Sequence, residues 1–240
     1  CGDVTMSDSC EISVMAADAG FLTYNLTDMG WAQISLADGS VTNLTEGADE
    51  TAVSAIASKD ATVYGYDTEL NFFQVNPKTG ERTVIGAADS EAAVAGWMTA
   101  LGYGEEDIAA EKDYYTFQIR DMAYDAANDR YLVLGAVVDK EYYSEMNYGD
   151  AIYEVNTEDG TLTEVYRMMD IYNVFAMTVD DKGTVYYHNS YNDYYTALDL
   201  TTGTATNIIS GQSQSLYGST ESTMAMHYDA STGLLYHLFT

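Results

Sequence analysis

The residues of this sequence that are best suited to binding chemistry are its clustered tyrosines. Tyrosine supplies 22 of the 240 residues, and many stand in pairs beside Asn, Asp or Ser. Each ring offers a flat apolar face and a hydroxyl at small entropic cost, which suits contacts with a sugar or a protein. Tyrosines that alternate within strands are expected in the core, so those in insertions and connections are the better candidates for a ligand. The candidate ligand-binding residues are Tyr142, Tyr143, Tyr148, Tyr191 and Tyr194.

Patterns that support catalysis are absent from the sequence. There is no G-x-S-x-G nucleophile motif, no H-E-x-x-H zinc motif, no P-loop and no G-x-G-x-x-G turn. The three histidines stand far apart, at 188, 227 and 237, and have no metal-ligand spacing. We therefore assign no catalytic residue from the sequence.

Acidic residues offer the only candidates for holding a cofactor. Asp180-Asp181 and the segment Glu105–Asp107 could ligate Ca²⁺, but neither belongs to a D-x-D-x-D-G loop. The sequence therefore predicts no cofactor, with Ca²⁺ as the alternative, and it leaves the metal ligands undefined.

Two cysteines, Cys1 and Cys10, lie at the start of the sequence. In an oxidising compartment they could form a disulfide that staples the N-terminal segment. Alternatively, Cys1 followed by Gly2 and Asp3 resembles the mature start of a bacterial lipoprotein, in which the first cysteine carries a lipid anchor. A free thiol is the third alternative. Because the chain opens on Cys rather than Met, we expect that an upstream segment has been removed.

The formal charge is the most extreme bulk property of the chain. The 38 acidic residues against 9 basic ones give a net charge of −29. Such a surface repels phosphate backbones and anionic headgroups, which argues against nucleic acid and against direct membrane insertion. It is typical of a secreted protein that gains solubility from its charge, or of one that attracts Ca²⁺ or basic partners. We expect an extracellular or cell-surface location.

A hairpin motif recurs four times around a turn glycine. The aligned segments are AQISLADGSVTNL (32–44), FFQVNPKTGERTVI (72–85), IYEVNTEDGTLTEV (152–165) and TALDLTTGTATNII (196–209). Aliphatic residues lie five positions before and after each glycine, and a threonine lies three positions after it. This pattern predicts strand, tight turn and strand, with the glycine at positive φ. The glycines are Gly39, Gly80, Gly160 and Gly203.

A second hairpin motif precedes each of these hairpins and occurs once more near the end. Its first strand carries an apolar anchor, and an aspartate usually follows three residues later. We expect this aspartate to cap the turn through the backbone rather than to act in catalysis. The anchors are Met15, Ile56, Met122, Met177 and Met226, and the aspartates are Asp18, Asp125, Asp180 and Asp229.

The two motifs together predict an all-β fold, a β-propeller of four-stranded antiparallel blades. Four full blades and half of a fifth form a single domain over 1–240, because adjacent four-stranded meanders must stack to bury both faces. Either the chain continues past Thr240 or a partner covers the open edge of the last blade. The predicted blades span 12–45, 52–85, 119–167, 174–209 and 223–239.

Three insertions lengthen the repeats. The sequence SEAAVAGWMTALG predicts a helix near 89–102, between the second and third blades. Segments 139–150 and 210–222 lengthen two further connections on the same face of the propeller. We call this face, which carries the B–C and D–A connections, the loop face. Long loops on a rigid scaffold are where function is usually placed.

The segments Tyr153–Thr163 and Ala197–Thr206 carry a resemblance to known repeats. They resemble the bacterial secreted propellers of the quinoprotein-dehydrogenase-like and YVTN/NHL-like class, whose blades close on Y-x-V-D-x-x-T-G-x-x-T. The resemblance covers nearly all of 12–239 and implies a scaffold rather than a reaction. The blade tryptophans of quinone-binding members are missing, so no active-site residue is carried over.

Three functions remain open on the sequence alone. The leading hypothesis is a non-enzymatic extracellular or cell-surface propeller that binds a protein or glycan through its loop face. The second is a propeller enzyme of hydrolase, lyase or cyclase type with its site at the central channel. The third is a structural subunit that self-assembles, with a neighbouring chain completing the incomplete last blade. An enzyme should gather His, Glu or Arg in the channel, whereas the anchors of the innermost strands are Met and Ile.

Overall fold

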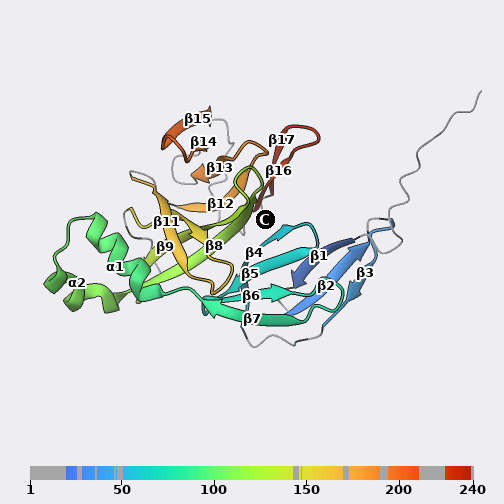
Figure 1. The fold of residues 1–240 in the computed structure, drawn as a ribbon, viewed down its shortest axis with the longest axis horizontal. Coiled ribbons are helices and arrows are strands. Elements are labelled where there is room, and N and C mark those ends of the chain that lie inside the picture. The colour runs from blue at the N-terminus through green and yellow to red at the C-terminus, as the bar shows by residue number, and fades with distance from the viewer. Residues whose placement is uncertain are drawn as a thin grey trace, which may run out of the picture.

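The computed structural model describes residues 20–25, 29–35, 37–45, 47, 51–142, 146, 148–169, 173–189, 194–210 and 225–238. Within these residues the chain forms five antiparallel sheets that follow one another around a common axis (Figure 1). Three of the sheets have four strands in meander order. The predicted β-propeller fold is therefore confirmed.

The strands follow the predicted hairpins closely. Blade one contains β1 (Gly20–Asn25), β2 (Gly30–Ser35) and β3 (Val41–Asn43), and its predicted innermost strand falls within 11–19, outside the described residues. Blades two and three contain β4 (Val53–Lys59), β5 (Thr62–Asp67), β6 (Asn71–Val75), β7 (Arg82–Ala87), β8 (Tyr115–Asp125), β9 (Arg130–Asp139), β10 (Ala151–Val155) and β11 (Leu162–Arg167). Blades four and five contain β12 (Val174–Val179), β13 (Thr184–Asn189), β14 (Tyr194–Asp199), β15 (Thr204–Ser210), β16 (Ala225–Asp229) and β17 (Leu234–Leu238).

In blades two to five the first strand lies innermost. Strands β4, β8, β12 and β16 contact one another in sequence around the axis, while the later strands of each blade lie progressively farther out (Figure 1). Because an innermost strand pairs on one side only, half of its backbone N–H groups face the axis or the neighbouring blade. These strands therefore position any side chain that reaches the channel.

The turn glycines have two separate roles. Gly80 and Gly160 have φ of 71° and 73°, the left-handed conformation that the turn motif predicts. A Cβ atom on Gly80 would also lie 2.8 Å from the Cβ of Trp31 in the preceding blade. On Gly160 it would lie 2.3 Å from the Cβ of Phe72. Glycine is therefore required both for the turn and for close packing between blades.

The recurrent aspartates cap the turns of the first hairpins, as predicted. Asp125 accepts a hydrogen bond from the backbone N–H of Asn128 at 3.2 Å, and Asp180 accepts one from Lys182 at 2.9 Å. Asp229 accepts one from the backbone N–H two residues later, also at 2.9 Å. Asp18 lies outside the described residues. The equivalence of these carboxylates thus reflects turn geometry.

The hydrophobic core consists of layers between neighbouring blades. One cluster joins blades one and two around Trp31 and Phe73. A larger cluster joins blades two and three and includes Met122, and a third joins blades three and four and includes Met177. The anchors Ile56, Met122 and Met177 are therefore packing residues between blades.

The insertion between blades two and three contains the predicted helix, α1 (Ser90–Ala100). Asp89 caps it by accepting the backbone N–H of Ala92 at 3.0 Å, and Trp97 is among its buried residues. A second helix, α2 (Glu105–Glu111), and a 3₁₀ turn, η1 (Lys112–Tyr114), follow where the sequence analysis expected an acidic loop. A seven-residue helix without a buried face has no periodic signal, but its acidic first turn complements the helix dipole.

The same insertion corrects one predicted boundary. Strand β8 begins at Tyr115, four residues before the predicted start of blade three at 119, because it pairs with β9 up to Asp139. Neither of the two helices found in the described part of the chain is long and apolar enough to cross a membrane.

Candidate functional site

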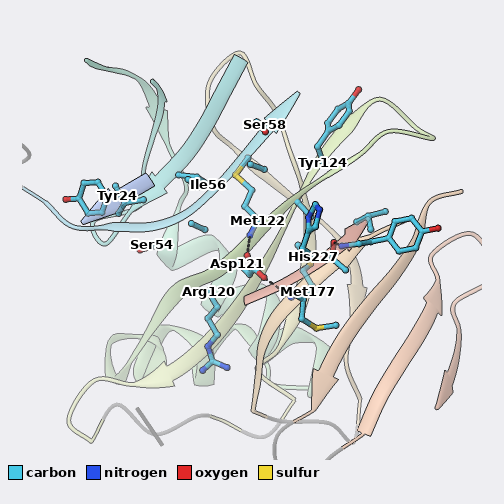
Figure 2. A pocket seen from close by; sticks show the side chains of 18 of the residues that line it. Tyr24, Ser54, Ile56, Ser58, Arg120, Asp121, Met122, Tyr124, Met177 and His227 are labelled. Atoms are coloured by element: carbon cyan, nitrogen blue, oxygen red, sulfur yellow. Dashed lines mark hydrogen bonds between the residues drawn. The ribbon is translucent and has the colours of Figure 1, made fainter. Parts of the chain in front are cut away.

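A cavity of about 780 Å³ lies at the centre of the ring of blades. Its walls come from β1, β4, β8, β12 and β16, so all five blades contribute (Figure 2). A volume of this order is typical of sites for small molecules. We call this cavity the central channel.

Apolar and polar residues contribute equally to the channel wall. The anchor side chains of Met122 and Met177 are only 4% and 1% exposed, because they pack into the blade interfaces. The polar and titratable lining residues are Thr23, Tyr24, Ser54, Ser58, Arg120, Asp121, Tyr124, Thr178, His227 and Tyr228.

Asp121 is the acidic residue of this lining. Its Oδ1 accepts the backbone N–H of Met122 and its Oδ2 accepts the backbone N–H of Met177, both at 2.8 Å (Figure 2). The carboxylate thereby joins the innermost strands of blades three and four. Although part of the residue faces the channel, burial raises the pKa of Asp121 to about 7, against the lowering effect of the two N–H donors.

The sequence analysis missed Asp121, although the repeat itself contains the signal. The residue immediately before the anchor is alanine in three of the blades and aspartate only in blade three. Aligning the anchors and looking for departures from the repeat would have singled it out. The alanines are Ala55, Ala176 and Ala225.

Arg120 occupies a β-bulge beside Asp121. The register of β8 against β9 shifts between Ile119 and Asp121, which leaves Arg120 as the extra residue. Its Nη1 donates to Oδ1 of Asp150 at 3.2 Å and to the carbonyl oxygen of Val174 at 3.0 Å. The side chain of Asp150 is 2% exposed. These contacts make Arg120 a second polar connection between blades three and four.

The predicted tyrosine site is only partly described. Tyr142 is 74% exposed, and its backbone N–H donates to Asp139 at 2.9 Å. Tyr148 has a φ of 60° and accepts a hydrogen bond from Arg167 on its carbonyl oxygen at 3.0 Å. Tyr194 belongs to β14 by its backbone, and its side chain is not described. Tyr143, Tyr191, Cys1 and Cys10 lie outside the described residues.

Two exposed tyrosines that were not predicted from the sequence, Tyr103 and Tyr114, lie near the segment that carries Tyr142. The backbone N–H of Lys140 donates to the carbonyl oxygen of Tyr114 at 2.9 Å, which places Tyr114 beside the segment of Tyr142. Burial raises the pKa of Tyr115, and the charges of Glu111, Tyr103 and Asp139 raise it further, so Tyr103 borders the same region. Tyr103, Tyr114 and Tyr142 are 39%, 65% and 74% exposed, and we call them the tyrosine patch.

The tyrosine patch lies in an acidic environment. Segments 89–114 and 139–142, which carry it, contain nine acidic residues and two lysines. One of these lysines, Lys112, is paired with Glu91. Within the described part of the chain, no three His, Cys, Asp or Glu side chains are grouped so as to hold a metal ion. The predicted Ca²⁺ candidate Asp180 uses its Oδ1 in the turn that follows β12.

The sequence matches no known protein family and no curated protein. The fold, however, is similar to that of solved propellers. A chain in a nidogen/laminin complex matches with a TM-score of 0.55 at 12% identity, over 88% of this chain and 66% of that one. A putative gluconolactonase matches with a TM-score of 0.56 at 14% identity, over 92% and 68%. Regucalcin from Agrobacterium tumefaciens, described as a calcium-binding protein, matches with a TM-score of 0.51 at 16% identity, over 90% and 62%.

These similarities define the class of the protein but not its activity. The matched structures include six-bladed propellers, and this chain spans about two thirds of their length. At such low identity the likeness shows the fold alone. The chain is a β-propeller protein.

Proposed function

We propose that this chain is a binding propeller of the cell exterior, which docks a basic partner protein through the tyrosine patch of its loop face and catalyses no reaction. The observation that carries the proposal is the exposure of Tyr103, Tyr114 and Tyr142 on two neighbouring insertions. Exposed aromatic groups of this kind are enriched at protein interfaces, where they give large contact area at small entropic cost.

The tyrosine patch rests on a firm support. Trp97 of α1 is 2% exposed and packs edge-on against Tyr115, with ring centroids 5.0 Å apart. Ser90 accepts a hydrogen bond from the backbone N–H of Phe117 at 3.0 Å, which ties the start of α1 to β8. A patch that is already ordered loses little entropy on binding, which favours recognition.

The negative charge around the tyrosine patch favours binding of one class of macromolecule. Nine acidic residues against two lysines create a negative potential around the tyrosines, and the whole chain adds to it with a net charge of −29. Such a field accelerates the approach of a basic partner and repels acidic ones. A neutral glycan would use the rings but would gain nothing from the charge.

The hydrogen bonds of the polar residues in the central channel support the proposal that the chain catalyses no reaction. Asp121 already accepts hydrogen bonds from Met122 and Met177, and Arg120 is engaged by Asp150 and Val174. An enzyme needs an acid or base that is placed against a second reacting group. The elevated pKa of Asp121 is the one observation that favours a channel enzyme, since such shifts cluster at functional sites.

The test compares the wild-type chain with the double variant Tyr114→Ala/Tyr142→Ala. The probes are a lysine- and arginine-rich peptide, a glutamate-rich peptide of the same length, and a soluble neutral polysaccharide. We expect the basic peptide alone to bind, with affinity reduced about tenfold in the variant and falling with added salt.

The matched control is Tyr236→Ala, which removes a tyrosine that is 49% exposed on blade five. Equal losses in the two variants would contradict a specific patch. Binding of the polysaccharide without the basic peptide would replace the proposal with glycan recognition.

A further inference from the structure

Asp121 is the feature of the molecule that the tyrosine patch leaves unexplained. It stands on an innermost strand where blades two, four and five have alanine, so the blade repeat itself requires only a small side chain there. A carboxyl group in this place loses much of its contact with water, which is unfavourable. A residue that departs from the repeat in spite of an unfavourable loss of hydration indicates a functional position.

The carboxylate of Asp121 retains binding capacity. Its two oxygen atoms together offer about four acceptor positions. Each oxygen accepts one backbone N–H, from Met122 and from Met177, and the residue is part of the channel wall. Both oxygens can therefore accept a further donor from a molecule in the channel.

The other titratable side chains of the channel wall come from three strands. They are Arg120 and Tyr124 on β8, His227 and Tyr228 on β16, and Tyr24 on β1. The lining parts of β4 and β12 contribute none. The side chain of Arg120 extends away from the carboxylate of Asp121 and pairs with Asp150 (Figure 2).

We propose that the central channel binds a small organic cation, a primary ammonium on an apolar body, with the ammonium donating to Asp121. The apolar lining, including Leu22, Ile56 and Val179, would contact the body of the ligand. The charge of −29 raises the local concentration of cations at the channel. A divalent metal ion suits the described residues less well, because they offer no group of three carboxylate, imidazole or thiolate ligands.

The ligand series that tests this proposal keeps the apolar body constant. Hexylamine, hexanol and hexanoate are titrated into the wild-type chain at pH 8 by calorimetry. We expect hexylamine to bind in a saturable manner, and the other two to bind about tenfold more weakly or worse, since a charge-assisted hydrogen bond accounts for the difference. Equal binding of hexylamine and hexanol would overturn the role of the carboxylate.

The variant Asp121→Ala installs the residue of the other blades. We expect it to lose affinity for hexylamine about tenfold while leaving the weak binding of hexanol unchanged. The matched control is Asp113→Asn, which removes one exposed negative charge outside the channel and should leave the affinity unchanged. Unchanged hexylamine binding in Asp121→Ala would refute the site.

A pH profile of the wild-type chain keeps the proposal testable if Asp121→Ala does not fold. As the pH falls from 8 to 6, protonation of Asp121 should weaken hexylamine binding, because burial raises its pKa to about 7. An imidazole in the channel wall is a second possible source of pH dependence in this range. The variant His227→Gln removes that imidazole and should show the same pH profile of hexylamine binding as the wild-type chain. A flat profile would overturn the proposal.

The channel site does not depend on the tyrosine patch. The double variant Tyr114→Ala/Tyr142→Ala should bind hexylamine as the wild-type chain does. Loss of hexylamine binding in that variant would place the cation on the loop face instead and refute the channel site.

Discussion

The boundary between blades two and three differs in kind from the boundary between blades three and four. At the first, Gly160 lies against Phe72, and the hydroxyl of Tyr66 donates to the carbonyl oxygen of Gly160 at 2.7 Å. At the second, the carboxylate of Asp121 accepts the N–H of Met177. The buried pair of Arg120 with Asp150 in blade three also hydrogen-bonds the backbone of Val174 in blade four. The repeat can thus stack by close apolar packing with an exposed ion pair, Lys59 with Asp129, at the surface of the boundary, whereas blade three buries its charges at the boundary with blade four.

Buried charges are therefore not needed for stacking. Burying an ion pair or a carboxylate usually stabilises a protein no more than well-packed apolar residues would. Breaking such a pair is nevertheless expensive, because it leaves a charge without its partner. The polar boundary is therefore expected to be more sensitive to single substitutions, and it borders the proposed cation site.

The largest expected effect follows loss of Arg120. Arg120→Met leaves the carboxylate of Asp150, which is 2% exposed, without its cation. We expect the free energy of unfolding to fall by about 3–5 kcal/mol, measured by urea denaturation. The double variant Arg120→Met/Asp150→Asn should recover a large part of this loss. A double variant as unstable as the single one would show that packing of the arginine, and not charge, holds the boundary.

The next effect tests the apolar boundary. Gly160→Ala places a Cβ atom 2.3 Å from the Cβ of Phe72 at a φ of 73°, and we expect a loss of about 2–4 kcal/mol. Gly39→Ala is the matched control, because its φ is 72° and a Cβ atom there meets nothing within 4 Å. It should lose only about 1 kcal/mol from backbone strain. Equal losses would mean that the turn alone, and not blade packing, selects glycine.

Asp121 predicts a pH dependence that distinguishes the polar boundary. Its pKa is about 7 in the folded protein and near 3.8 in the unfolded chain, so the folded state binds the proton more tightly. The contribution to stability is therefore complete below pH 4 and is lost as the pH rises to 7. Between pH 5 and pH 8 the unfolding free energy of the wild-type chain should fall by roughly 2–3 kcal/mol more than that of Asp121→Ala. Parallel pH profiles would contradict the shift.

The smallest effect concerns one hydrogen bond of the apolar boundary. Tyr66→Phe removes the buried hydroxyl that donates to Gly160 and keeps the ring, which lies 5.0 Å from the ring of Phe72. We expect a loss of about 1 kcal/mol by urea denaturation, with ring packing intact. A loss as large as that of Arg120→Met would remove the contrast between the two boundaries.

Much of the fold could be predicted because local chemistry repeats along the chain. The glycine turns, the capping aspartates and the α1 segment each depend on a few neighbouring residues, so a periodic pattern indicates them directly. Helix α2 gave no such pattern, because its seven residues bury no face. The tyrosine patch was predicted only at Tyr142, since Tyr114 lies near it through the pairing of β8 with β9, and Tyr103 lies near Tyr115 through the fold of the helical insertion.

The sequence by itself determined the blade repeat, its strand order and the exceptional position of Asp121 among alanines. These properties depend on side-chain alternation and turn geometry, which act over a few residues. Only the tertiary structure decided that Met122 and Met177 pack between blades and that Asp121 reaches from β8 to β12. Contacts between blades depend on how whole sheets are rotated against each other. A local sequence pattern does not determine that rotation.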